Sequence, residues 1–213
     1  MKVLSNNLEN QPQLRDDLEE AIDHGILVSK LAFHLAKEMD LPKEFCYAMA
    51  EAGLLHDIGK LKLGKYLYGR KKNALIVEEM KYIRMHSTLG YNILKKFNYS
   101  EDVCEGVHHH HENYDGSGYP HNIKGESIPL GARILRICDV YATLISDRRN
   151  RIAFDQETAI KLMIEEIKNF DMKIFLIFVT TVNKEEYKDI ESFINYLNSK
   201  EFTWSNILHD GYY

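Results

Sequence analysis

Two stretches decide how this chain is interpreted: His56-Asp57-Ile58-Gly59-Lys60, and HHHHENYDGSGYP from His108 to Pro120. The first places an imidazole beside a carboxylate. The second places a run of imidazoles directly before a glycine-rich loop that ends in Gly118-Tyr119-Pro120. Imidazole and carboxylate groups are ligands that Fe, Mn, Zn, Ni and Co accept in proteins. Together the two stretches predict a polynuclear metal site of the kind that cuts a phosphodiester.

The composition is that of an ordinary globular protein. The 213 residues are 45% hydrophobic and 28% charged, enough for one domain with a good core, or one domain with a small appendage. The net charge of −5 argues against nucleic-acid polymers or anionic membranes as partners. No run approaches the roughly 18–20 apolar residues needed to span a bilayer, and the N-terminus lacks the apolar core of a signal peptide. We therefore expect a cytoplasmic location.

The cysteines do not suggest a metal site. Cys46, Cys104 and Cys138 are odd in number and far apart, and no CxxC pair occurs. This pattern predicts reduced, mostly buried thiols.

Helical periodicity dominates the chain and predicts an all-α fold. The segment 172–182 has the composition of a strand, but a single strand has no partner in a helical chain, so we predict a core helix there. Pro42 and Pro129 suit helix starts, and Ser100 and Asp155 suit N-caps. The expected helices cover about 14–40, 42–56, 77–97, 100–110, 129–146, 155–169, 172–182 and 184–199.

The expected architecture is a single bundle of about seven or eight helices with a metal site in its core. Residues 1–183 would form this domain. Residues 184–213 would form a C-terminal helix and tail packed on the same domain.

Candidate metal ligands occur on five successive predicted helices. Glu20 and His24 are four residues apart, so they share a helix face, although such a pair is more often a solvated ion pair when it stands alone. An isolated helical histidine such as His34 is interpreted as a surface residue or one with its hydrogen bonds satisfied. Because one ion takes about four to six ligands, eight candidates predict more than one ion. They are Glu20, His24, His56, Asp57, His86, His110, His111 and Asp139.

With these motifs the chain resembles the HD-GYP domains, which are bacterial members of the HD metallophosphohydrolase superfamily. The resemblance covers about residues 14–182. It is carried by HDIGK, the MKYIRMHSTLG segment, HHENYDGSGYP and KGESIPLGARILRICDVY. The family pattern selects His110, His111 and Glu112. His108 and His109 fall outside it and are interpreted as incidental.

The resemblance implies a cyclic di-GMP phosphodiesterase that yields linear diguanylate and then GMP. The metal ions would neutralise the phosphodiester and lower the pKa of a bridging water, which supplies hydroxide at neutral pH. By position, seven residues match the family's ligands, with Asp57 bridging two ions. Glu20 matches an extra carboxylate of members with a third metal. Two or three divalent ions are thus expected, with iron first and manganese or another transition metal next. The seven are His24, His56, Asp57, His86, His110, His111 and Asp139.

The resemblance also implies how the substrate is held. Lys60 matches a lysine near the scissile phosphate, so Asp57 and Lys60 are the expected catalytic residues. The loop of Gly118, Tyr119 and Pro120 would lie near the guanine or sugar. Arg148 and Arg151 would contact the phosphates, for which the guanidinium fork is suited.

Three segments depart from the family pattern and leave other functions open. Ala142 replaces a usual Asp, DRRNRI at 147–152 stands in place of DRPYRK, and LKLGKYLYGRKKNA at 61–74 replaces a proline-rich stretch. These changes motivate a second hypothesis, an HD phosphohydrolase acting on a different nucleotide such as a mixed cyclic dinucleotide.

A third hypothesis is a non-catalytic module that binds a cyclic dinucleotide or a protein partner. It predicts missing ligands, and none is missing. A signalling protein could also dock through the GYP loop of an active enzyme, and the oligomeric state is left open.

Overall fold

The computed structural model describes residues 12–63, 77–147, 152–184 and 187–199, and every regular element in these ranges is a helix. The all-α class predicted from the sequence is confirmed. The helix predicted over 172–182 is present as α10. The α-helices are α2 (Pro12–Glu38), α3 (Lys43–Leu55), α5 (Val77–Arg84), α6 (His86–Lys96), α7 (Glu101–His109), α8 (Leu130–Ile145), α9 (Gln156–Glu165), α10 (Met172–Thr181) and α11 (Lys188–Asn198).

The single helix predicted over 77–97 is wrong. The structure has two helices, α5 and α6, separated by Met85. Short 3₁₀ helices complete the described elements: η1 (Ile58–Leu63), η2 (Gly125–Ser127) and η3 (Ile167–Asn169).

Local sequence signals account for several helix starts. The Ser100 hydroxyl accepts a hydrogen bond from the Val103 N–H at 3.4 Å, and Asp155 accepts one from the Thr158 N–H at 2.9 Å. Such caps satisfy N–H groups that the first helical turn leaves unpaired. Pro42 and Pro129 stand immediately before α3 and α8, where the fixed φ of proline favours helix entry.

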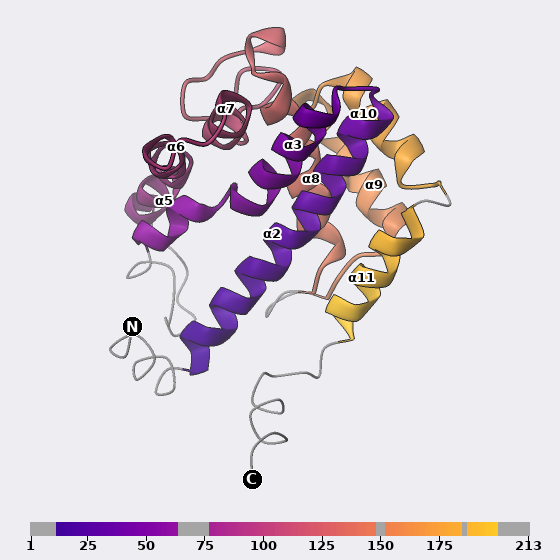
Figure 1. The fold of residues 1–213 in the computed structure, drawn as a ribbon. Coiled ribbons are helices and arrows are strands. Elements are labelled where there is room, and N and C mark those ends of the chain that lie inside the picture. The colour runs from indigo at the N-terminus through magenta and orange to yellow at the C-terminus, as the bar shows by residue number, and fades with distance from the viewer. Residues whose placement is uncertain (1–11, 64–76, 148–151, 185–186, 200–213) are drawn as a thin grey trace.

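The long helix α2 crosses the molecule diagonally, with α3 and α8 packed against it (Figure 1). Helix α7 packs on both α3 and α8, and α6 packs on α7 and η1. Helices α9, α10 and α11 lie on the other side of α8 and α2 (Figure 1). This arrangement brings α2, α3, α6, α7 and α8 around a common interior.

The burial of apolar side chains along α2 shows which face of this helix packs against the core. Leu31 and Leu35 are buried, as expected from their spacing, whereas Ile22 is 57% exposed. Ile22 lies nine residues before Leu31, which at about 100° per residue places it on the opposite face of the helix.

The C-terminal helix α11 packs on the same group of helices. Ile190 is buried, and the Asn198 side chain donates a hydrogen bond to the Ile145 carbonyl at 2.9 Å. The Lys30 ammonium of α2 lies 5.5 Å from the centre of the Phe193 ring. Within the described residues, no helix has both the length and the apolar character that crossing a membrane would require.

Candidate metal centre

Seven of the eight predicted ligands, all except Glu20, converge in the interior of the helix bundle. His56 and Asp57 follow the end of α3, His86 is the first residue of α6, and His110 and His111 follow the end of α7. His24 and Asp139 lie within α2 and α8. The structure thus brings all seven side chains, which span 116 sequence positions from His24 to Asp139, into one cluster.

The first half of the cluster joins imidazoles to carboxylates. His24 Nε2 lies 2.9 Å from Asp139 Oδ1, and His56 Nε2 lies 3.7 Å from the same oxygen. His56 Nε2 is also 3.4 Å from Asp57 Oδ2. His24, His56 and Asp57 each offer a ligand atom, and these atoms lie within 4.8 Å of one another.

The second half consists of imidazoles. His86 Nε2 lies 3.2 Å from His110 Nε2 and 3.1 Å from His111 Nε2. The two halves meet at Asp57, whose Oδ1 is 3.3 Å from His86 Nε2. Asp57 therefore faces both groups of ligands, the position expected of a carboxylate shared between two ions.

Three of the histidines are oriented by the same kind of hydrogen bond to the backbone. In each, Nδ1 donates to the carbonyl three residues earlier: His56 to Gly53 at 2.7 Å, His86 to Ile83 at 2.6 Å and His110 to Val107 at 2.7 Å. A proton on Nδ1 leaves a lone pair on Nε2, the atom that points into the cluster. This arrangement fixes both the tautomer and the ring orientation of a metal ligand.

The donor set fits divalent cations. Since His86 and His110 donate through Nδ1, their Nε2 lone pairs face each other at 3.2 Å and repel unless a cation lies between them. Buried His56 Nε2 and Asp57 Oδ1 have no hydrogen-bond partner in the described structure, although buried polar atoms ordinarily have one. Both observations are accounted for by metal ions bound to these atoms.

The protonation states also suit metal binding. Burial would raise the pKa of Asp57, but His56 and then Lys60 lower it well below its usual range. Burial likewise opposes ionisation of Asp139, while the hydrogen bond from His24 and the charge of His56 hold its pKa well below the usual range. The cluster therefore presents anionic carboxylates, as metal ligation requires.

The histidines on the α7 side remain neutral. Burial lowers the pKa of His111 to about 3 and that of His110 well below its usual range. His56, at the end of α3, behaves differently: burial would lower its pKa, but its contact with Asp57 outweighs burial and raises it. A metal ion at this position would replace the proton that the Asp57–His56 pair otherwise retains.

The remaining predicted site residues lie around this cluster. Glu20 is half-buried, one helical turn before His24 on α2. Lys60 donates a hydrogen bond to Asp57 Oδ2. Arg148 and Arg151 lie outside the described residues, as does most of the departing segment 61–74, from residue 64 onward. Ala142, where the family pattern has an Asp, is fully buried in α8.

Gly59 allows the HDIGK turn to approach the next ligand helix. A Cβ at this position would lie 1.9 Å from the His86 carbonyl oxygen and 2.7 Å from the Gly90 nitrogen. Only glycine lets η1 and the first turn of α6 come this close. The glycine of the motif thus positions His86 relative to Asp57.

The GYP loop folds back onto the end of α7. A Cβ at Gly118 would lie 2.2 Å from the Asn113 nitrogen, so the close approach requires glycine there. The Tyr119 N–H donates to the His111 carbonyl at 3.1 Å, and the two rings stack with centroids 4.7 Å apart. The loop therefore forms one wall of the metal centre.

Three further residues lie at this wall: Glu112, which the family pattern selects without assigning it a role, and Arg84 and Arg136, which were not among the predicted site residues. Glu112 is buried, and its Oε1 accepts a hydrogen bond from the His121 N–H at 2.6 Å. The Arg84 guanidinium lies 5.2 Å from the centre of the Tyr119 ring. Arg136 donates to Asn113 Oδ1 at 3.0 Å. Arg136 precedes Asp139 by three residues on one helix, a spacing that signals a shared face; no sequence signal singles out Arg84.

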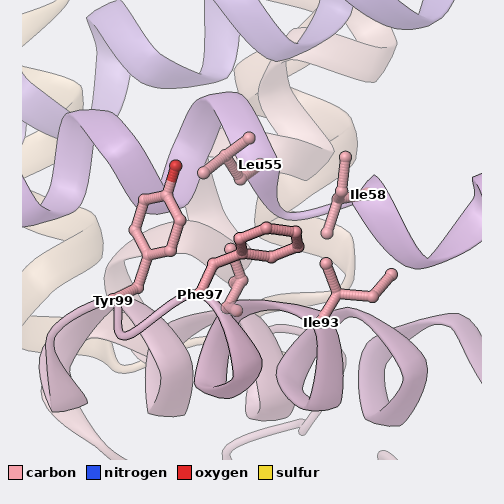
Figure 2. A pocket seen from close by; sticks show the side chains of 6 residues that line it. Leu55, Ile58, Ile93, Phe97 and Tyr99 are labelled. Atoms are coloured by element: carbon pink, nitrogen blue, oxygen red, sulfur yellow. The ribbon is translucent and has the colours of Figure 1, made fainter.

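An apolar pocket of about 460 Å³ lies behind the HDIGK turn. Leu55 and Ile58, which flank His56 and Asp57, line one side of it, and Ile93, Phe97 and Tyr99 line the other (Figure 2). Neighbouring residues here therefore face in different directions. Leu55 and Ile58 line the apolar pocket beside α6, while His56 and Asp57 face the metal centre.

Comparisons with known proteins show which family the chain matches. The model of the HD domain family matches residues 2–174. A cyclic di-GMP phosphodiesterase of Pseudomonas aeruginosa is 34% identical over 181 residues, which are 83% of this chain and 43% of the relative. A 3'3'-cGAMP-specific phosphodiesterase of Vibrio cholerae is also 34% identical, over 77% of this chain and 38% of the relative. The chain thus spans less than half the length of these curated relatives.

Solved structures show the same fold. A cyclic GMP-AMP-specific phosphodiesterase of Vibrio cholerae superposes with a TM-score of 0.63 at 19% identity, over 88% of this chain and 53% of the other. The HD domain of the L. monocytogenes phosphodiesterase PgpH, in complex with cyclic di-AMP, superposes with a TM-score of 0.53 at 16% identity, over 95% of this chain and 98% of the other.

Proposed function

The chain belongs to the HD domain family, and we propose that it is a metal-dependent phosphodiesterase that hydrolyses a cyclic dinucleotide, with cyclic di-GMP as the expected substrate. The observation that carries this proposal is the convergence of His24, His56, Asp57, His86, His110, His111 and Asp139 into one cluster with facing lone pairs. Curated relatives of 34% identity carry names with this activity.

The two halves of the cluster would hold at least two divalent ions, with Asp57 between them. When bound, such ions neutralise the phosphodiester and lower the pKa of water to supply hydroxide. The resemblance to HD-GYP domains implies iron as the first expected metal and manganese as the alternative, and both accept mixed imidazole and carboxylate ligands. Glu20, one turn from His24, is the proposed ligand of a third ion.

The chain's own residues would bind and orient the anionic substrate. Lys60 lies against Asp57 and would contact the scissile phosphate, and Arg84 and Arg136 add positive charge beside Tyr119. The Tyr119 ring, stacked on His111, offers a flat face near the metal centre against which a base or sugar would pack. Arg148 and Arg151 remain proposed phosphate contacts.

The similarity to cGAMP-specific enzymes supports a second substrate. The Vibrio cholerae relative named for 3'3'-cGAMP and the Pseudomonas aeruginosa relative named for cyclic di-GMP are both 34% identical to this chain. The two substrates differ in one base, so the residues that contact that base, and not the metal ligands, would decide between them. Docking of a signalling protein on the GYP loop also remains a proposal.

The test is a substrate panel under anaerobic conditions. Purified protein loaded with Fe(II) or Mn(II) is incubated with cyclic di-GMP, 3'3'-cGAMP and cyclic di-AMP, and the nucleotides are separated by chromatography. We expect linear diguanylate and GMP from cyclic di-GMP, and no product with a chelator. Asp57→Asn should abolish turnover, whereas the matched control His34→Ala, which changes a histidine outside the cluster, should retain it.

The outcomes separate the hypotheses. Cleavage of 3'3'-cGAMP alone would keep the phosphodiesterase and replace its substrate. If all three nucleotides stay intact with a fully metal-loaded protein, the proposed activity is rejected, in favour of hydrolysis of another nucleotide or of a binding module.

A further inference from the structure

A second group of histidines lies beside the metal centre but outside its proposed ligand set. His108 and His109 belong to the last turn of α7, and His121 directly follows the Gly118-Tyr119-Pro120 loop. Each offers one ring nitrogen, and these atoms lie within 4.8 Å of one another. His108 is half-buried, His109 is buried and His121 is exposed. No role was predicted for His108 and His109 from the sequence, and this grouping appears only in the structure.

Glu105 orients the His109 ring in this group. The His109 Nδ1 lies 3.2 Å from the Glu105 carbonyl oxygen and 3.3 Å from Glu105 Oε2. Both atoms are acceptors, so they assign the proton to Nδ1. The lone pair is then on Nε2, which faces His121 Nδ1 at 3.1 Å. A carboxylate or carbonyl on the far nitrogen is the usual partner of a metal-bound histidine.

The His108 ring is oriented by two residues of α6, Tyr91 and Thr88. It stacks on the Tyr91 ring with centroids 4.4 Å apart, and its Nε2 lies 3.4 Å from the Thr88 hydroxyl. The ring meets that of His121 edge-on, with centroids 5.0 Å apart. Two of the three imidazoles are therefore oriented by neighbouring residues and converge with the third at the protein surface.

The spacing of the nitrogens suits a tetrahedral ion. Two nitrogens at about 2.0–2.1 Å from a tetrahedral Zn²⁺ are roughly 3.3 Å apart, close to the 3.1 Å that separates His109 Nε2 from His121 Nδ1. A direct hydrogen bond between these two rings would explain their distance alone. It would not explain the third imidazole within reach of both.

We propose that His108, His109 and His121 form an accessory site for one divalent transition-metal ion of the Zn²⁺ type, distinct from the metal centre. Three imidazoles supply three positions, and the exposure of His121 leaves the fourth to water. The bound ion joins the end of α7 to the residue that follows Pro120. It thereby reinforces the hydrogen bond from the His121 N–H to Glu112, which already ties this loop to α7.

The test is the Zn²⁺ content of the intact chain after saturation and gel filtration, measured by elemental analysis. We expect His121→Ala to bind one equivalent fewer than the wild type. His121→Cys should keep that equivalent, since a thiolate is also a zinc ligand. The backbone hydrogen bond to Glu112 is available to both variants, and His34→Ala controls for loss of a histidine elsewhere.

Comparing His121→Ala with His121→Cys distinguishes the loss of a zinc ligand from a disturbance of the loop. Equal zinc content in the wild type and His121→Ala would overturn the accessory site. Loss of the ion from both His121→Ala and His121→Cys would also overturn it, because a replacement ligand should restore binding. A second variant, His108→Gln, should lose the same single equivalent; retention there would remove His108 from the site.

Discussion

His86 connects the two halves of the metal centre. Its Nε2 lies 3.3 Å from Asp57 Oδ1 and within 3.2 Å of the Nε2 atoms of His110 and His111. Its other nitrogen is committed to the Ile83 carbonyl. The hydrogen bond to Ile83 orients the His86 ring so that its Nε2 faces ligands of both halves.

The buried histidines make the metal-free protein sensitive to acid. Burial lowers the pKa of His111 to about 3, whereas a histidine in the unfolded chain titrates near 6.5. Between these values the unfolded state binds the additional proton, so the free energy of unfolding falls as the pH drops below about 6.5. We expect the Tm of chelator-treated protein to decrease from about pH 7 to about pH 4.5, as measured by circular dichroism.

His111→Gln provides the matched comparison for this pH dependence. The variant lacks one of the titrating groups, so its Tm should change less steeply over the same range. A Tm that rises toward acid in the metal-free wild type would contradict the assignment of neutral, buried imidazoles.

The Tyr119 ring, and not its hydroxyl, should matter for substrate binding. Tyr119→Phe keeps the ring that stacks on His111 and lies under Arg84, so we expect little change in KM. Tyr119→Ala removes a stacking surface worth about 0.5–1.5 kcal/mol, or roughly a 2–10-fold rise in KM. Steady-state kinetics on the proposed substrate test this. Equal effects of the two substitutions would assign the role to the hydroxyl instead.

At the scale of elements, the break between α5 and α6 determines where a ligand points. The periodicity over 77–97 predicts one continuous helix, but α5 ends at Arg84 and a new helix, α6, begins at His86. The first turn of α6 then packs on η1, which follows the His56-Asp57 pair directly. The interruption thus places His86 next to Asp57.

The contact between η1 and α6 should not tolerate a larger residue. A Cβ at position 59 would lie 1.9 Å from the His86 carbonyl oxygen, so Gly59→Ala must displace the backbone that carries a ligand. We expect a loss of about 3 kcal/mol in the free energy of unfolding and a reduced metal content. Urea denaturation and elemental analysis measure the two effects.

Gly106→Ala is the matched control, because its nearest neighbour would be the Leu135 side chain at 3.4 Å and alanine favours the helix interior. It should leave both stability and metal content intact. If Gly59→Ala behaved like Gly106→Ala, the close packing of η1 on α6 would be disproved.

At the scale of the whole molecule, bound metal should hold the helices together. The proposed ligands belong to or directly follow α2, α3, α6, α7 and α8, so an ion that binds only the folded state stabilises all five. At a free concentration about 100 times Kd the gain is about 2.7 kcal/mol, or roughly 5–10 °C in Tm for a chain of this size. Thermal unfolding with and without a chelator tests this, and added metal should restore the Tm. An unchanged Tm would argue against ligation by the folded cluster.

Local signals in the sequence were sufficient for most of the fold and for the proposed ligand set. Caps such as Ser100 and Asp155 and the prolines before α3 and α8 act within one or two turns, so helix starts follow from neighbouring residues. The resemblance to HD-GYP domains, carried by HDIGK and the HHENYDGSGYP motif, is confirmed by the comparisons. That resemblance also predicted which histidines lie together in the folded chain.

Only the tertiary structure decided which residues surround those ligands. Arg84 beside Tyr119 and His121 beside His109 depend on how a loop folds back across a helix end, which no local pattern specifies. The break between α5 and α6 at Met85 likewise has no counterpart in the helical periodicity over 77–97. Periodicity and capping act over a few residues, whereas these contacts arise when several helices pack at once. For that reason the motifs of the sequence predicted the ligand set, and the packing of the helices determined which residues surround it.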